Sequence, residues 1–287
     1  MRRFPVFMVL FFGAALCAGA VRDFRTRDGK VVRGELFAYN PRTDKLTIVT
    51  EKKKTVQLKG NDLADEDYIH VRDWDSVRLF SQNTHFRMYF SGPDSLNKWS
   101  RILWRRPPGK VDAQQTYRID HNRMGYGIKF DNQTGYDLEN LEIKYNIFYL
   151  QERMDYWKEE KVPEIVVRPC RLRMAVVPAG KNQKIATRTV VLRRKEIAAA
   201  GTKLRYLEGD GRFLKSQMIG AIFRISIRTR SGQAAVREIR LPKELSEHYV
   251  WVEPTAENSV WPDDDLDERE AVARPPTLWV EQGGQED

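Results

Sequence analysis

The sequence contains few of the residues from which reactive sites and covalent cross-links are built. Its 287 residues include two cysteines, Cys17 and Cys170, and four histidines. Cys17 lies in an N-terminal segment that we expect to be removed, so one thiol remains and no intramolecular disulfide can form. Cys170 stands among apolar residues in "VVRPCRLRMAVV", a context typical of a buried structural thiol. The fold must therefore be held by a packed core.

Common motifs of catalysis and cofactor binding are missing as well. No two of the histidines have the spacing of a zinc helix or hairpin; they are His70, His85, His121 and His248. The sequence has no glycine-rich phosphate loop and no Gly-x-Ser-x-Gly elbow. We therefore expect no metal, no cofactor and no enzymatic activity.

Paired carboxylates leave one route to catalysis open. Asp120 with Asp131, and Glu139 with Glu142, could be neighbours in space, and paired carboxylates hydrolyse glycosides when held at a suitable separation. A chain with 40 acidic residues forms such pairs freely, which favours ordinary surface charge. The alternative is a hydrolase of envelope polysaccharide or peptide, with a β-sandwich as its accessory module.

The N-terminus has the features of a secretory signal peptide. Arg2 and Arg3 precede an apolar stretch at residues 4–16, and small residues follow up to Ala20, after which we expect cleavage. The apolar stretch is shorter than the roughly 20 residues that span a bilayer, so we expect no membrane span in the cleaved chain. Retention as an anchor and a lipid on Cys17 are the alternatives. The predicted location is secreted or periplasmic.

Charge is divided unevenly along the chain. The whole sequence has a net charge of +9, but residues 253–287 hold eleven acidic and two basic residues, so the body is strongly basic. The composition of this tail predicts a disordered acidic segment that contains two tryptophan-bearing stretches, "SVWP" and "TLWVE". The tail either contacts the basic body of its own chain or remains solvated.

Residues 21–72 have the pattern of a small β meander. Asp28-Gly29-Lys30 is a turn signal, because glycine supplies the positive φ that tight turns need. Short apolar runs follow, each bounded by turn residues. The segment ends in "NDLADEDYIHV", where Asp62 or Asp65 could cap a single helical turn.

This segment resembles the first type of Sla homology domain, a small SH3-like barrel found in an endocytic adaptor and in predicted exported bacterial proteins. The shared positions are Phe24, Thr26, Gly29, Lys30, Glu35, Leu63, Asp67, Tyr68 and Ile69. The adaptor module binds short peptides through basic residues near its last hairpin. The resemblance therefore implies a peptide partner, with Lys52, Lys53 and Lys54 in the corresponding region; a solvated turn is the alternative for these lysines.

The rest of the body predicts a β-sandwich. After a charged linker at residues 73–84, strand after strand with period-two alternation runs through residues 85–252. Little helix is expected outside "KELSEHY" and "DSLNKWSRIL". The unit "YGIKFDNQTGYDLENLEIKYNIFY" resembles sandwiches that follow the barrel module in predicted exported proteins. The predicted fold is all-β: an SH3-like barrel, an immunoglobulin-like sandwich and the acidic tail.

One stretch, "NKWSRILWRRPPGK", combines aromatic and basic residues as sites for anionic polymers do. Aromatic faces stack on sugars, and arginines pair with sulfate, phosphate or carboxylate. The candidate binding residues here are Trp99, Arg101, Trp104, Arg105 and Arg106. The alternative is that the aromatic side chains only pack against the sandwich.

These observations favour an exported, non-catalytic protein that binds a protein, a peptide or an anionic envelope polymer through its β modules. Export makes nucleic acid a less accessible ligand than a glycan, in spite of the basic charge. A structural role in an assembly, with the tail of one copy against the body of the next, is a further hypothesis.

Overall fold

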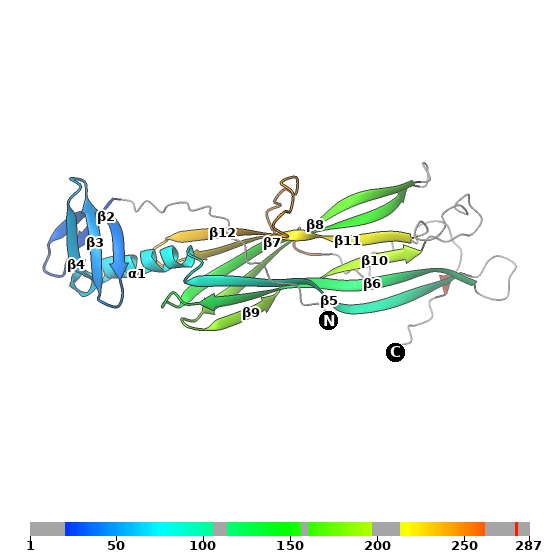
Figure 1. The fold of residues 1–287 in the computed structure, drawn as a ribbon, viewed down its shortest axis with the longest axis horizontal. Helices are drawn as coiled ribbons and strands as arrows, with labels where there is room; N and C mark the ends of the chain where they lie inside the picture. Colours follow the sequence, from blue (N-terminus) through cyan, green and yellow to red (C-terminus); the bar gives the residue numbers. More distant parts are fainter. Residues whose placement is uncertain (1–20, 106–113, 156–159, 197–212, 262–278, 281–287) are drawn as a thin grey trace.

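Two β units joined by one helix make up the protein (Figure 1). The computed structural model describes residues 21–105, 114–155, 160–196, 213–261 and 279–280. Within these residues, α1 is the sole α-helix and strands form most of the chain, so the predicted all-β class is confirmed. The predicted signal peptide at residues 1–20 lies outside this range.

The N-terminal unit is a four-stranded antiparallel meander in the order β1-β2-β3-β4. Its elements are β1 (Arg22–Arg25), β2 (Val31–Asn40), β3 (Lys45–Thr50), β4 (Thr55–Lys59) and the 3-10 turn η1 (Gly60–Asp62). Gly29 has a φ of 84°, as the predicted turn requires. The inward residues Phe24, Leu46 and Ile48 are fully buried. A single bridge between Thr26 and Leu63 brings the end of the meander back to its start.

The helix α1 (Asp65–Phe80) replaces both the single helical turn and most of the linker expected at residues 73–84. Neither predicted cap is used: Ala64 occupies the N-cap position. Three acidic residues fill the first turn, where the positive end of the helix dipole stabilises them. One of them, Asp67, also accepts hydrogen bonds from Arg22 (2.6 Å) and from the backbone N–H of Arg25 (2.8 Å), which fixes the helix against β1.

The two ends of α1 are buried in different cores. Val71 and Trp74 pack with the meander, whereas Val77 and Phe80 pack inside the sandwich. Because its apolar residues face two partners, the helix has no single apolar stripe from which its length could be predicted. This arrangement makes α1 a shared structural element and not a flexible linker.

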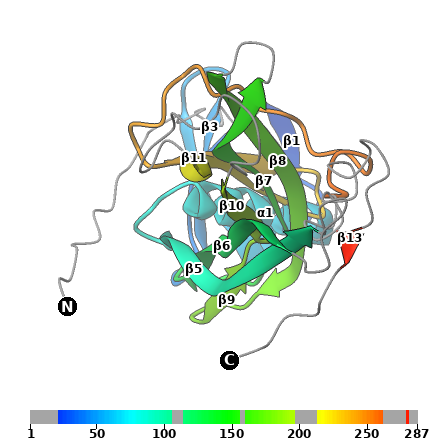
Figure 2. The same ribbon diagram turned by 90° about the vertical axis from the view of Figure 1, so that its right-hand side faces the viewer.

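The second unit is a sandwich of long strands. Its strands are β5 (Phe86–Arg105), β6 (Gln114–Asn132), β7 (Leu138–Asp155), β8 (Glu160–Val177), β9 (Asn182–Ala186), β10 (Val190–Glu196), β11 (Phe213–Arg228) and β12 (Ala234–Leu241). One layer contains β5, β6, β9 and β10, and the other contains β7, β8, β11 and β12 (Figure 2). The layers are continuous through pairing of β10 with β11, and β13 (Trp279–Val280) pairs with the end of β5.

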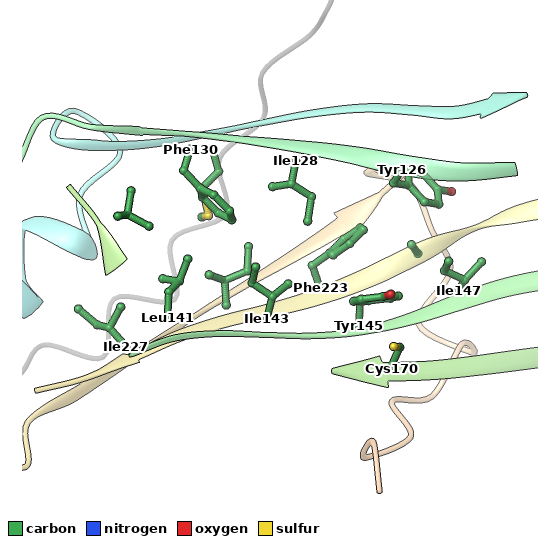
Figure 3. Packing of buried hydrophobic residues seen from close by; sticks show 14 of the residues in the cluster. Tyr126, Ile128, Phe130, Leu141, Ile143, Tyr145, Ile147, Cys170, Phe223 and Ile227 are labelled. Carbon is green, nitrogen blue, oxygen red and sulfur yellow. The ribbon is translucent and has the colours of Figure 1, made fainter. Parts of the chain in front are cut away.

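The main core lies between these layers, as Figure 3 shows. Tyr126, Ile128 and Phe130 of β6 face the β7 and β11 residues, among them Tyr145 and Phe223. Such alternation of buried and exposed residues is what a strand with one covered face requires. Cys170 is 3% exposed in this core, so its predicted burial is confirmed.

Two segments expected to be helical are not. "DSLNKWSRIL" belongs to β5, where its register with β6 shifts at three points, and "KELSEHY" forms turns. Bulges of this kind bend a strand and add local twist, which obscures period-two alternation in the sequence. No helix of the described residues is long and apolar enough to cross a lipid bilayer.

A segment that we call the strap, residues 242–261, crosses the outer face of the β7–β11 layer after β12 ends. Leu245 packs with Phe148 and Ile222, and the Tyr249 ring lies 5.3 Å from the Phe148 ring. Trp251 lies 4.2 Å beneath the guanidinium of Arg224. The strap therefore buries apolar residues of the sheet that would otherwise face solvent.

The last part of the strap corrects the prediction of disorder for the whole of residues 253–287. Glu253 forms an ion pair with Lys144, and the indole N–H of Trp261 donates to the carbonyl of Pro169 over 2.8 Å. The guanidinium of Arg188 also lies 4.9 Å from the Trp261 ring. Residues 253–261 are thus docked on the body, and the rest of the tail lies outside the described residues except for β13.

Arg237 offers a test of how α1 is held in the sandwich. Its guanidinium donates to the carbonyls of Phe80 (3.1 Å) and Phe86 (2.8 Å), and burial lowers its pKa to about 10. Arg237→Met should lower the free energy of unfolding by about 3 kcal/mol, because two carbonyls lose a charged donor. Urea unfolding followed by circular dichroism measures this.

Arg230→Met is the matched control, because Arg230 is exposed and pairs with Glu139 at the surface. Its effect should be much smaller. Equal losses in the two variants would contradict the role given to Arg237.

Candidate functional site

The inward face of β6 changes from apolar to polar partway along the strand. Phe130 and Met124 pack on the core, and the same side of the strand continues with Asn122, Asp120 and Arg118. Side chains two residues apart point to the same face of a strand. The hydrophobic core therefore ends near Met124, and a polar surface begins on the half of β6 that is farther from α1.

Neighbouring strands extend this polar surface. Asp120 is directly opposite Ser100 of β5 and Arg194 of β10, and Asn122 is opposite Lys98. Together they line an open hollow of about 470 Å³. Its lining is Lys98, Trp99, Ser100, Arg118, Asp120, His121, Asn122, Leu192, Arg193, Arg194 and Ser216. We call it the basic hollow.

Asp120 is the carboxylate at the centre of the basic hollow. It accepts hydrogen bonds from the hydroxyl of Ser100 (2.7 Å) and from Nε of Arg118 (2.6 Å), and Arg194 lies 3.8 Å away. Partial burial acts to raise the pKa of Asp120, but these hydrogen bonds and the two positive charges outweigh burial and lower it. Asp120 is therefore ionised at neutral pH and holds the surrounding cations in place.

The basic hollow carries an excess of positive charge. Four cationic side chains line it, against one carboxylate. Lys98, Ser100 and Arg194 are exposed, so the hollow is open to solvent. A concave surface with charges of mainly one sign concentrates ions of the opposite sign. The hollow can therefore attract and hold anionic groups.

Trp99, one of the lining residues of the basic hollow, contacts β6 through its ring. Its indole stacks on His121 of β6, with ring centroids 4.9 Å apart and planes at 2°, and the guanidinium of Arg123 lies 5.3 Å from the indole. His121 is in turn directly opposite Arg193 of β10. This row of aromatic and cationic side chains fixes the strands next to the basic hollow.

The structure separates the predicted binding residues into two places. Lys52, Lys53 and Lys54 are exposed in the turn between β3 and β4, in the N-terminal unit. Trp99 lines the basic hollow, and Arg101 lies two residues farther along β5. Trp104 and Arg105 end β5, but their side chains, like all of Arg106, lie outside the described residues.

The predicted carboxylate pairs do not form joint sites. Asp120 and Asp131 are eleven residues apart on β6, which corresponds to roughly 36 Å along a strand. Glu142 pairs with Arg171 (2.5 Å), and Glu139 pairs with Arg230 (2.8 Å). Among the described residues, no group of three or more His, Cys, Asp or Glu side chains could hold a metal ion.

Most residues of the basic hollow were not predicted as binding residues. Arg118, Asn122 and Arg194 lie in strands that the sequence pattern identified only as structural. One signal was present: the period-two series that is apolar from Phe130 to Met124 becomes polar over the next three positions. The strands around these polar residues are brought together by pairing between distant parts of the sequence. The local pattern carries no information about that pairing.

Comparison with known proteins leaves the family open. No protein-family model matches the chain, and no curated protein matches it. Among solved structures, a structural-genomics target designated SoR45 has 9% sequence identity and a TM-score of 0.18, over 60% of this chain and 96% of that one. The sporulation control protein Spo0M from Bacillus subtilis has 8% identity and a TM-score of 0.17, over 55% and 50%.

Asp120→Asn tests the electrostatics of the basic hollow. The folded pKa of Asp120 lies below its ordinary 3.8, so its charge stabilises the fold above that pH and the stabilisation is lost as the pH falls through the lowered value. The variant should be less stable than the wild type at pH 7, and the difference should vanish well below pH 3.8. Urea unfolding at a series of pH values measures this; a difference that is independent of pH would contradict it.

Proposed function

We propose that the protein is an exported, non-catalytic binding protein that holds an anionic polysaccharide of the cell envelope in the basic hollow. The observation that carries this proposal is the ratio of four cationic side chains to one carboxylate in the lining. Fixed cations next to a low-dielectric protein wall favour binding of anions over neutral ligands. Acidic proteins or peptides are the other partners with this charge.

The lining also has the chemistry to bind sugars. Arginine guanidinium groups pair with carboxylate, sulfate or phosphate through two parallel hydrogen bonds. Asn122 and Ser216 add neutral groups that can donate to or accept from hydroxyls. Because the hollow is open to solvent, a polymer chain can lie across it, and neither end of the polymer has to enter an enclosed site first. These properties favour a repeated acidic sugar over a small enclosed ligand.

Two features of the sequence support the proposed location in the cell envelope and a second binding surface on the N-terminal unit. The N-terminal signal-like segment supports a partner in the cell envelope or outside the cell. Lys52, Lys53 and Lys54 are exposed in a turn of the unit that resembles the Sla homology domain. In this proposal, that unit presents a separate surface for a protein or peptide.

Lys98→Glu tests the proposed site. Wild-type protein should bind dextran sulfate, with an affinity that falls as salt increases, and should not bind neutral dextran. Lys98 is exposed in the hollow, so its charge reversal should weaken binding by roughly tenfold, which corresponds to about 1.4 kcal/mol. Isothermal titration calorimetry at two salt concentrations measures both effects.

Lys181→Glu is the control for net charge. Lys181 is exposed in a turn beside Asn132, at the opposite end of β6, and its substitution changes the total charge equally. It should leave binding close to wild type. The proposal fails if dextran sulfate does not bind, if binding is insensitive to salt, or if the two variants lose the same affinity.

A further inference from the structure

The strap binds its sheet through alternate residues. Tyr249, Trp251 and Glu253 contact the sheet, whereas Val250 and Val252 between them are 72% and 38% exposed. In an extended segment, alternate side chains point to the same side. The strap therefore turns one side to the sheet and the other to solvent.

The strap places an aromatic ring and an acid, two residues apart, on two cations of the sheet. Lys144 of β7 and Arg224 of β11 are directly opposite each other. Each also has an acidic neighbour on the sheet, Glu142 at 3.7 Å from Lys144 and Glu238 at 2.9 Å from Arg224. The Trp251 ring lies under Arg224 at 4.2 Å, and Glu253 pairs with Lys144. The indole N–H also donates to Glu253 over 2.9 Å, which orients the carboxylate. Tryptophan, any residue, then glutamate is thus the sequence that this site, which we call the Trp251 site, accommodates.

The same sequence occurs a second time in the chain. Residues 250–253 read "VWVE" and residues 278–281 read "LWVE", so an aliphatic residue, tryptophan, valine and glutamate recur in order. The protein has seven tryptophans, and two of them stand in this motif. The third tryptophan of the C-terminal region, Trp261, is followed by Pro262 and Asp263 and does not match it.

We propose that residues 278–281 are a second ligand for the Trp251 site and occupy it in the same molecule when residues 250–253 leave. The sixteen residues at 262–277 can extend to about 50 Å, which allows the second motif to return to the sheet from the docked Trp261. A tethered ligand also has a high effective concentration. The site is therefore an exchange site for two copies of one motif.

The contacts of the second motif in the structure are compatible with exchange. With residues 250–253 in place, Trp279 and Val280 form β13 and pair with two residues at the end of β5. A pairing of two residues is short for a strand. The proposed exchange requires this pairing with β5 to break when the second motif moves to the Trp251 site.

A double-mutant cycle in the full-length protein tests the exchange. Trp251→Ala should lower the melting temperature, and the loss should be larger by about 3 °C when Trp279→Ala is also present, because the second motif can no longer fill the site. Trp279→Ala alone should have little effect. Calorimetry of the four proteins at several concentrations measures the coupling.

Trp261→Ala combined with Trp279→Ala is the matched control. Trp261 is docked in the same strap but is not part of the motif, so its effect and that of Trp279→Ala should add. As a direct measurement, a synthetic peptide of residues 277–282 should raise the melting temperature of the Trp251→Ala/Trp279→Ala protein. The same peptide with its tryptophan replaced by alanine should bind at least about tenfold more weakly.

Additive effects of Trp251→Ala and Trp279→Ala, or a peptide without effect, would overturn the exchange. Coupling that appears only as the protein dimerises at high concentration would overturn its assignment to the same molecule. None of these outcomes changes the binding of dextran sulfate, because the Trp251 site and the basic hollow share no lining residue.

Discussion

The burial of α1 in two cores is the constraint on which the rest of the structure depends. If the helix left the meander, the side chains of Val71 and Trp74 would be exposed to water. If it left the sandwich, those of Val77 and Phe80 would be exposed. Polar contacts fix the same helix from the side: the hydroxyl of Tyr136 donates to buried Asp75 over 2.9 Å. A helix held in this way transmits its position from one unit to the other. The N-terminal unit and the sandwich are consequently joined by a helix that belongs to both cores.

The basic hollow follows from the length of β6 relative to the core. Nineteen residues extend over roughly 60 Å, which is longer than the part of the strand that the opposite layer covers. Where that cover ends, apolar residues would face water, so the inward positions after Met124 are polar. The strands that pair there remain in register, and Asp120 collects Ser100, Arg118 and Arg194 around one carboxylate. A rigid polar surface is thereby built on strands and requires no binding loop.

Local patterns in the sequence were sufficient for the strands, the turn at Gly29 and the burial of Cys170, because each depends on neighbouring residues. They were insufficient for α1, whose apolar residues divide between two partners, and for the helix expected in β5, where bulges disturb the alternation. They were also insufficient for the docked part of the tail. Glu253 and Trp261 have partners 109 and 92 residues away in the sequence, at Lys144 and Pro169, and local composition contains no information about these.

The strap-covered face and the basic hollow can be compared by the acidic side chains that lie close to their cations. The body has a large excess of basic residues, and the outer face of the β7–β11 layer places Lys144 directly opposite Arg224. On that face, Glu253 and Trp251 of the strap join two acids of the sheet, Glu142 and Glu238, around these two cations. Among the lining residues of the basic hollow, Asp120 is the one carboxylate, and no residue of the docked strap lines the hollow. The strap-covered face and the basic hollow therefore differ in what covers their cations: residues of the strap lie on the first, and none of them lies in the second.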